Sequence, residues 1–442
     1  MTPRDPATTI GDPKTTDVGS VFVSNYPPYS AWSADRVPDV HAMLDAPPSA
    51  DAPLGLYLHV PFCRKRCKFC YFKVFTDRNA GEVQTYVDAL ATEVELYSAR
   101  PALAGRALKF VYFGGGTPSF LSGRQLGSLV SRAKAAMPWD AVSEVTFECE
   151  PGTLSEPKLG TLRDIGITRL SLGVENFDDR ILEENGRAHL SREIFRVVPW
   201  IKALDFEQLN VDLIAGMVGE TWDTWRDTVR KTVDTDPDSV TVYQMELPFN
   251  TVYSRDKLGG RDVPVADWSL KREWHDYAFT ELERAGYEVS SAYTVVKRGR
   301  GAGFVYRDAL WRGADLLGTG VASFSHVQGL HFQNVSGWSP YLERLAAGEL
   351  PVERAFVTGP EDRLTRETIL QLKLGRLDRG YFRDKFGVDV VGRFGEAFDR
   401  LAARDMLEVR DRDVRLTRQG LLRVDGLLPE FYAASYRGAR YT

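Results

Sequence analysis

Three features are scarce in this chain of 442 residues: cysteine, long apolar runs and a surplus of one charge sign. Its four cysteines are too few and too clustered for the disulfide framework of a small secreted protein. No apolar run approaches the roughly 18 to 20 residues of a membrane span, and the first thirty residues show no secretory signal pattern. The formal charge of −5 argues against wholesale binding to nucleic acid or to an anionic membrane. We therefore expect a cytoplasmic protein that binds neither.

A hydrophobic fraction of 43% is enough to build a full-sized core. From residue 54 on, short apolar β-forming runs alternate with helical spacing about six times, which predicts a parallel sheet wound by helices. Six units are too few for an eightfold barrel, so the expected fold class is α/β with a partial (β/α)6 barrel. The expected strands span 56–60, 108–113, 142–148, 169–174, 208–214 and 239–246, and the expected helices include 82–96, 122–137 with Ser122 as N-cap, 156–164 and 222–235.

The expected organisation has four parts. An N-terminal arm covers 1–50, is disordered in its first fifteen to twenty residues, and packs through the aromatics between Tyr26 and Trp32. The barrel covers 51–250, and a barrel extension that covers the substrate spans 251–355. A small helical domain with a β-wing at 407–416 covers 356–442; it resembles a winged helix, but the acidic balance makes DNA binding unexpected.

Three of the four cysteines, Cys63, Cys67 and Cys70, form a C-x3-C-x2-C run directly after the first expected strand. Three thiolates on one loop can bind three corners of an iron-sulfur cube and leave one iron open to another ligand. A tetrahedral zinc site is the rival interpretation, with His59 or Cys149 as fourth ligand. The basic residues between the cysteines are expected to lower the thiol pKa values.

Other polar residues follow the remaining strands, at the edge where parallel α/β folds bind ligands. After the second strand, the turn Gly114-Gly115-Gly116-Thr117 lets the backbone approach a ligand closely. Carboxylates and an arginine follow the next strands: Glu148, Glu150, Glu175, Arg187 and Asp212. They suit a ribose-bearing zwitterion, although structural roles are an alternative for each.

Together, the cysteine run and the Gly-Gly-Gly-Thr-Pro turn resemble radical S-adenosylmethionine (SAM) enzymes. Three further segments resemble one branch of these enzymes, the HemN-like branch: Leu56 to Cys63, the Tyr26-Pro-Pro arm, and Leu317 to Ser323. The resemblance to this branch covers roughly residues 20 to 435. The resemblance implies a radical SAM barrel and a [4Fe-4S] cluster bound by the three cysteines. The open iron of this cluster would be chelated by one SAM, and reduction of the cluster would cleave that SAM to a 5′-deoxyadenosyl radical. The resemblance also implies a second SAM.

The resemblance assigns cofactor-binding roles by position. The residues implied at the first SAM are Tyr57, Gly115, Glu148 and Phe324. Gly114, in the same turn, is also a candidate for cofactor binding. Those implied at the second SAM are Phe69, Gly116, Thr117, Glu175, Arg187 and Asp212.

Within this branch, our main functional prediction is transfer of a methylene radical unit from the second SAM to an sp2 carbon of a natural product, giving C-methylation or cyclopropanation. Three departures from the coproporphyrinogen III dehydrogenase pattern favour it: Phe72 in place of a fourth cysteine, Glu175 in place of glutamine, and strand ends with more acids than a tetracarboxylate substrate suits. The N-terminal aromatic arm from Tyr26 to Trp32 argues against a heme chaperone, because the resemblance implies that chaperones of this branch generally lack it. Oxidative decarboxylation of coproporphyrinogen III is the main alternative, and a heme carrier or a zinc scaffold is a more distant one.

The expected partners are an aromatic or unsaturated small molecule, an electron donor such as flavodoxin or ferredoxin, and a companion methyltransferase. The candidate catalytic residues are Glu175, His326 and His331; the two histidines are candidates for proton transfer, although a structural role is the simpler interpretation of each.

Overall fold

The computed structural model describes residues 16–48, 52–301 and 303–439 and divides into two compact units. The cysteine unit comprises the described parts of 32–212 and 304–358, and the C-terminal unit comprises those of 1–31, 213–303 and 359–442. Each unit joins segments that are far apart in sequence, so the units cut across the ranges expected for barrel and extension. Residues 1–15, where a disordered start is expected, lie outside the described residues.

The cysteine unit is built on a sheet whose hydrogen-bonded order is β12-β11-β10-β9-β1-β2-β3-β4. Its parallel part consists of β1 (Leu54–Val60), β2 (Leu108–Gly115), β3 (Glu144–Cys149), β4 (Arg169–Glu175) and β9 (Asp315–Thr319). Its antiparallel part consists of β10 (Phe324–Val327), β11 (Leu330–Asn334) and β12 (Val352–Val357). The parallel register brings the carboxyl ends of β1 to β4 to one edge, which is where the cysteine loop and the glycine turn begin.

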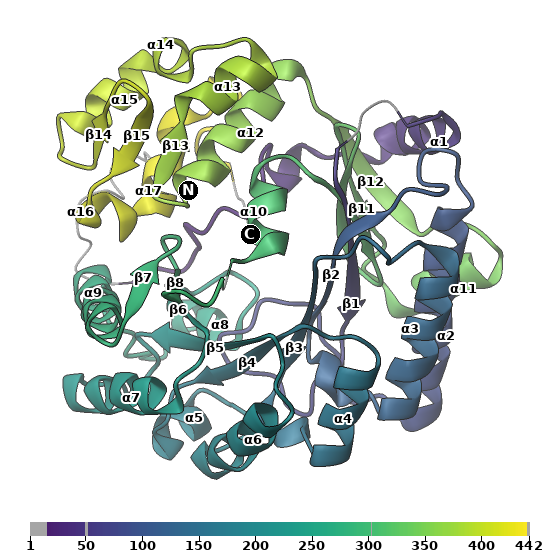
Figure 1. The fold of residues 1–442 in the computed structure, drawn as a ribbon, viewed down its shortest axis with the longest axis horizontal. Coiled ribbons are helices and arrows are strands. Elements are labelled where there is room, and N and C mark those ends of the chain that lie inside the picture. The colour runs from purple at the N-terminus through teal and green to yellow at the C-terminus, as the bar shows by residue number, and fades with distance from the viewer. Residues whose placement is uncertain (1–15, 49–51, 302, 440–442) are drawn as a thin grey trace. The chain divides into compact units, whose positions relative to one another are not determined.

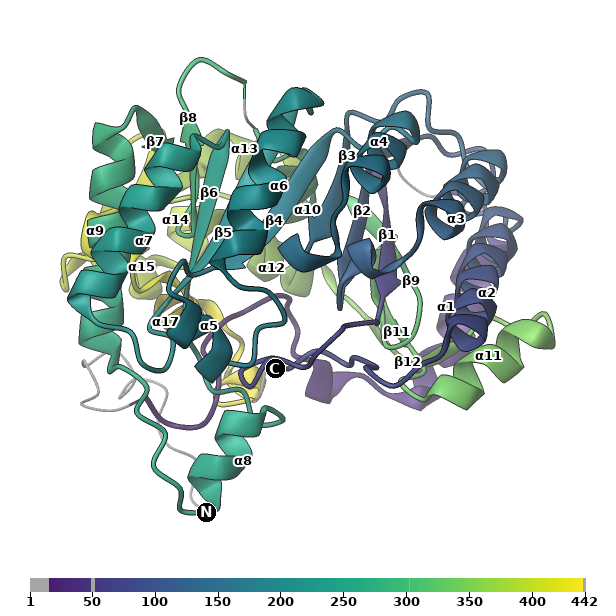
Figure 2. The same ribbon diagram turned by 90° about the horizontal axis from the view of Figure 1, so that it is seen from below.

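Helices return the chain between these parallel strands (Figures 1 and 2). They are α2 (Ala80–Ser98), α3 (Gly123–Ala136), α4 (Glu156–Asp164), α5 (Asp179–Glu184) and α6 (Ser191–Ala203). The Ser122 hydroxyl accepts a hydrogen bond from Gln125 N–H, which confirms the predicted N-cap. Figure 1 shows α10 (Val305–Trp311) on the face of β2 and β3 opposite α3, and α1 (Val37–Asp45) and α11 (Trp338–Ala346) complete the unit.

Strand β5 (Gln208–Ala215) begins in the cysteine unit and continues into the C-terminal unit. The latter contains an antiparallel sheet of β6 (Ser239–Gln244), β8 (Thr294–Lys297) and β7 (Tyr287–Val289), with helices α7 (Trp222–Thr235), α8 (Val252–Leu258) and α9 (Trp268–Arg284). Its last part holds α12 (Pro360–Leu372), α13 (Arg379–Phe386), α14 (Val390–Arg393), α15 (Gly395–Ala402), α16 (Arg418–Leu421) and α17 (Val424–Leu427) around β13 (Arg376–Asp378), β14 (Leu407–Val409) and β15 (Asp413–Leu416). Strands β14 and β15 form the predicted β-wing.

Two aromatic residues of the arm are buried, one in each unit. Tyr26 is 1% exposed, and its ring contacts Tyr432 and Tyr436 within the C-terminal unit. Trp32 belongs to the cysteine unit, where its ring stacks on His331. In the described ranges, no helix is long and apolar enough to cross a membrane.

Candidate functional site

The cysteine loop connects β1 to α2 and is held at several points. Cys63 N–H donates to Phe75 O at 3.1 Å, Phe75 N–H donates to Pro61 O at 2.7 Å, and Lys68 N–H donates to Asn185 O at 3.0 Å. All three cysteines are free thiols of intermediate exposure. This backbone pairing fixes the loop before any cofactor binds.

The thiols themselves behave differently from the prediction. Burial raises the pKa of Cys63 to about 11 and that of Cys70 to about 12, and the neighbouring Cys67 raises both further. The interleaved Arg66 does lower the pKa of Cys70, as expected, but burial outweighs it and the net shift is upward. Arg64 and Lys68 instead pair with Glu150 and Glu184.

The three cysteines lie on one loop, none is in a disulfide, and their thiols would bind a metal cluster as thiolates, losing their protons on binding. Among the described residues, no three His, Cys, Asp or Glu side chains are grouped to hold a single metal ion. A [4Fe-4S] cluster requires no such grouping, because each thiolate binds its own iron. The three cysteines therefore fit the cluster.

The glycine turn lies directly beside this loop. Gly116 N–H donates to Val60 O at 2.8 Å, and Thr117 Oγ1 lies 3.3 Å from Cys63 Sγ. Gly115 has φ +112°, and a Cβ atom there would lie 2.5 Å from the His59 ring. A side chain is therefore excluded by both backbone conformation and space.

Glu148, at the end of β3, faces the same turn. It accepts hydrogen bonds from Tyr112 OH at 2.8 Å and from Gly115 N–H at 3.1 Å. Burial raises the pKa of Glu148 to about 7. Tyr57 stacks on Tyr112, and its hydroxyl lies 3.2 Å from His59 Nδ1. The structure thus brings together three residues implied at the first SAM: Tyr57, Gly115 and Glu148.

Arg187 connects a second group to the cysteine loop. Its guanidinium lies 3.4 Å from Cys67 Sγ and 3.4 Å from a Glu175 carboxylate oxygen, and it donates to Gly173 O at 2.8 Å. Glu175 ends β4 with φ 63°, a left-handed backbone that is uncommon outside glycine. Burial raises the pKa of Glu175 to about 7, although Arg187 lowers it.

Asp212 on β5 is the remaining acid of this edge. It accepts hydrogen bonds from Ser171 Oγ at 2.7 Å and Asn210 Nδ2 at 2.9 Å, and burial raises its pKa to about 6. The charge of Asp212 in turn raises the pKa values of Glu148 and Glu175. The three acids therefore form one electrostatically coupled set.

A third group was missed as a unit by the sequence analysis. Arg64 donates to both carboxylate oxygens of Glu150, at 3.0 and 2.8 Å, and His189 Nδ1 lies 3.2 Å from the same carboxylate. Burial raises the pKa of Glu150, but His189 and Arg64 outweigh it and bring the pKa to about 2. Glu150 is thus a fixed anion that fastens the cysteine loop. The only signal in the sequence is Arg64 next to Cys63.

The remaining candidates lie elsewhere. His326 and His331 face each other across β10 and β11 with 3.1 Å between their Nδ1 atoms, and both are buried. Trp32 stacks on His331 and contacts Phe324 edge-on. Phe69 lies half-buried within the cysteine loop. Roles for these four residues in catalysis or SAM binding stay predictions.

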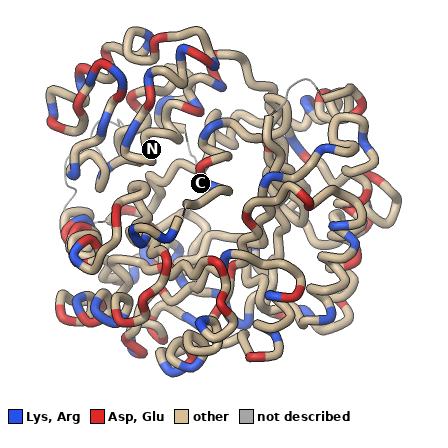
Figure 3. The backbone as a smooth tube through the Cα atoms, viewed as in Figure 1, with Lys and Arg blue, Asp and Glu red and all other residues tan. Residues whose placement is uncertain are grey.

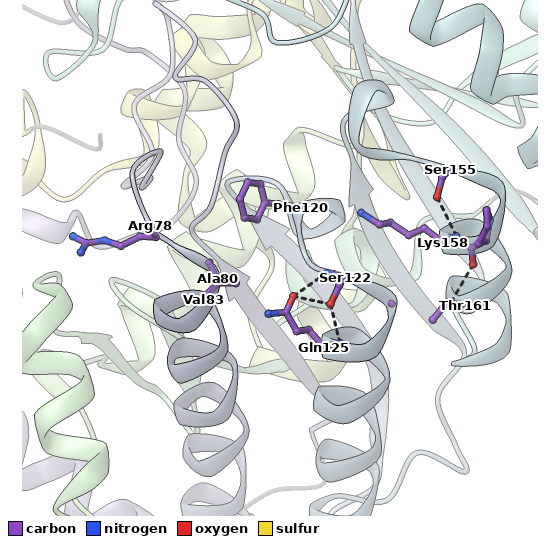
Figure 4. A pocket seen from close by; sticks show the side chains of 11 residues that line it. Arg78, Ala80, Val83, Phe120, Ser122, Gln125, Ser155, Lys158 and Thr161 are labelled. Carbon is purple, nitrogen blue, oxygen red and sulfur yellow. Dashed lines mark hydrogen bonds between the residues drawn. The ribbon is translucent and has the colours of Figure 1, made fainter.

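A cavity of about 560 Å3 opens at the N-terminal ends of α2, α3 and α4 (Figure 4). Its lining includes Arg78, Phe120, Gln125 and Lys158 and none of the predicted site residues. The residues predicted to bind the cofactors therefore lie at the strand ends and not around this cavity.

Comparison with known proteins agrees with this geometry. Residues 57–232 match the model of the Radical SAM superfamily. A relative from Pseudomonas aeruginosa named oxygen-independent coproporphyrinogen III oxidase is 27% identical, with 91% of each chain covered. The heme chaperone HemW of Bacillus subtilis is 27% identical over 83% of this chain and 96% of its own. The solved coproporphyrinogen III oxidase HemN of Escherichia coli superposes with a TM-score of 0.80 at 22% identity, covering 94% of this chain and 99% of its own.

The three-cysteine loop and the match over residues 57–232 support a radical SAM enzyme. Over most of its length the chain is similar to HemN-like members of that superfamily. The predicted fold class is confirmed, as is the prediction of a [4Fe-4S] cluster with SAM.

The prediction of one-carbon transfer is wrong. The relatives carry the names coproporphyrinogen III oxidase and heme chaperone, and no reported match supports a natural-product methylase branch. The expected companion methyltransferase loses its basis with that prediction. The physical error was to treat the acids at the strand ends as charges that face the substrate, whereas they face one another, Arg187 and backbone donors.

Proposed function

We propose that this chain catalyses the oxygen-independent oxidative decarboxylation of coproporphyrinogen III. The proposal depends on how much of this chain aligns with each kind of relative. The oxidase from Pseudomonas aeruginosa aligns over 91% of this chain, whereas HemW of Bacillus subtilis uses 96% of its own length and still leaves 17% of this chain without a counterpart. The oxidases thus account for more of the segments that this chain adds to its barrel.

The site chemistry supports this reaction class. When bound, the cluster and SAM supply a 5′-deoxyadenosyl radical that takes one hydrogen atom from a substrate carbon. A propionate side chain that has lost this hydrogen becomes a vinyl group by releasing CO2 and passing one electron to an external one-electron acceptor. The chain's own residues would position the cofactors: Glu148 and Tyr57 would contact the first SAM, and Arg187, Glu175 and Asp212 would hold a second SAM through its charged groups and ribose hydroxyls.

The acids at the strand ends do not oppose a substrate with carboxylates. Burial raises the pKa values of Glu148 and Glu175 well above the ordinary carboxyl value, which favours their neutral, protonated forms. Arg187 offsets Glu175, and Arg64 offsets Glu150. The net charge that a substrate meets at this edge is therefore much smaller than the count of acids indicates.

The test is anaerobic turnover of the reconstituted protein with dithionite, SAM and coproporphyrinogen III, followed by mass spectrometry. We expect 5′-deoxyadenosine and stepwise loss of carboxyl groups from the porphyrinogen. The Cys63→Ala variant is expected to lose both products with the cluster. The matched Cys149→Ala variant, altered at the buried cysteine outside the loop, is expected to keep its iron and sulfide.

A heme carrier is the second candidate, favoured by the HemW relatives and by Phe72 at the position of the dehydrogenases' fourth cysteine. It predicts stoichiometric heme binding, seen by absorbance, and no change in the porphyrinogen. That outcome would replace the oxidase proposal.

A further inference from the structure

The cysteine loop carries a concentrated positive charge. Residues 63–78 contain six basic side chains and one acidic side chain, a net charge of +5 in a chain whose total is −5. Elsewhere, basic and acidic residues are interspersed along the chain (Figure 3). A run of one sign beside the cluster cysteines therefore stands apart from the rest of the molecule.

Part of this charge is used within the fold. Arg64 pairs with Glu150 at 2.8 Å, Lys68 with Glu184 at 2.9 Å, and Arg78 with Glu82 at 2.7 Å. Lys65 and Lys73 are exposed, and no carboxylate of the described residues lies within 4.0 Å of either amino group. These two charges are available to a partner.

An exposed aromatic residue accompanies the two lysines. Phe72 is 42% exposed, follows Cys70 by two residues and stacks on Tyr71 at 4.5 Å between ring centroids. Exposed aromatic side chains are common anchors of protein interfaces, whose rims are polar. Phe72 thus offers an exposed apolar side chain two residues after Cys70 and directly before Lys73.

The loop is also rigid enough to act as a docking surface. Phe75 is bonded to Pro61 and Cys63 through its backbone, and its ring packs on Trp338 at 4.9 Å. The Arg78 guanidinium lies over the same indole at 4.7 Å. Arg78 also lines the cavity of Figure 4, together with Lys158, whose amino group donates to carbonyl oxygens of Ser119 and Thr153.

We propose that Lys65, Phe72 and Lys73 form the docking surface for an acidic one-electron carrier protein that reduces the cluster. One electron passes from the carrier to the cluster, and the carrier is oxidised by one electron. The inference rests on the radical SAM chemistry of the proposed function, which needs that electron, and not on its substrate. A small, charged contact of this kind matches transient redox complexes, which form quickly by electrostatic steering and separate again.

The experiment measures binding of a purified acidic flavodoxin, in its oxidised form, to the cluster-loaded protein at low and high salt. We expect the Lys65→Glu/Lys73→Glu variant to raise the Kd at least about tenfold at low salt, because two attractions become two repulsions. Phe72→Ser is expected to weaken binding severalfold with an unchanged dependence on salt.

The matched control is Lys109→Glu/Lys202→Glu, which changes the net charge equally. Lys109 lies at the start of β2 and Lys202 at the end of α6, at the opposite edge of the unit, and both are exposed. This control is expected to bind like the wild type. An equal loss in both double variants would overturn the proposal.

A second measurement follows 5′-deoxyadenosine formed from SAM with reduced flavodoxin or with dithionite, a small reductant that needs no docking. We expect the Lys65→Glu/Lys73→Glu variant to be impaired mainly with flavodoxin. Equal impairment with dithionite would place the defect in the cluster and contradict docking. Neither measurement uses a porphyrinogen, so failure of the proposed substrate leaves this test valid.

Discussion

Glu93 offers a direct test of how burial controls stability in the cysteine unit. This residue of α2 is fully buried and accepts hydrogen bonds from Tyr341 OH at 2.6 Å, Asn334 Nδ2 at 2.6 Å and Gly320 N–H at 2.7 Å. Burial raises the pKa of Glu93 to about 7, although these three donors lower it. In the described part of the chain, no lysine or arginine pairs with it.

The magnitude follows from this pKa. A rise from 4.5 to about 7 makes the charged form about 3 kcal/mol less favourable in the folded chain than in the unfolded chain. Between about pH 4.5 and pH 7, the Glu93 carboxyl is deprotonated in the unfolded chain and protonated in the folded chain. Stability from this group is therefore complete below about pH 4.5 and is lost as the pH rises through about 7.

The assay is urea unfolding of the apoprotein at several pH values for the wild type and Glu93→Gln. Glutamine does not titrate, so the wild type should lose about 2 to 3 kcal/mol more than the variant between about pH 5 and pH 8. The difference isolates Glu93 from the other buried acids. As control, Glu95→Gln on the exposed side of α2 should keep the wild-type dependence. Parallel curves for the wild type and Glu93→Gln would refute the reasoning.

Two further substitutions test the packing around the site. Gly115→Ala should destabilise the cysteine unit by at least about 2 kcal/mol and abolish SAM cleavage, because the new Cβ atom meets the His59 ring at a left-handed backbone position. The control Gly127→Ala, in open space on α3, should not destabilise the unit. Urea unfolding of both variants measures the difference. Arg169→Met removes the ion-pair partner of the buried Glu144, 3.0 Å away, and should lower the free energy of unfolding by about 3 to 5 kcal/mol. The control Arg226→Met breaks an exposed ion pair with Asp223 and should change the free energy of unfolding little. Equal losses in the two variants would argue against a stabilising buried pair.

The alternation of strands and helices was predictable because each element carries its own period. Predicted strand 208–214 matches β5, and predicted helix 222–235 matches α7. The segment 287–292 is less regular, because β7 ends at Val289 and the chain turns before β8 begins at Thr294. The Ser291 hydroxyl accepts hydrogen bonds from the N–H groups of Tyr293 and Thr294, which closes a turn that hydrophobic periodicity does not reveal.

The residues at the strand ends were predictable because parallel strands end at one edge, and the structure places Glu148, Glu175 and Asp212 in one coupled set. The Arg64–Glu150–His189 group was not, since it depends on how the cysteine loop folds back over a distant strand end. A sequence pattern shows which residues follow a strand and not which of them pair across loops.

The substrate was the weakest part of the sequence argument, for a physical reason. Side chains at the strand ends are the ones predicted to hold the cluster and SAM, which radical SAM enzymes share, so their types carry little information about what is oxidised. Counting acids there misjudged the charge, because burial changes protonation and Arg187 compensates Glu175. A tetracarboxylate must be recognised by cations outside this first group of residues. Such cations follow no motif, so the extent of the match to whole relatives was more informative about function than any single residue of the site.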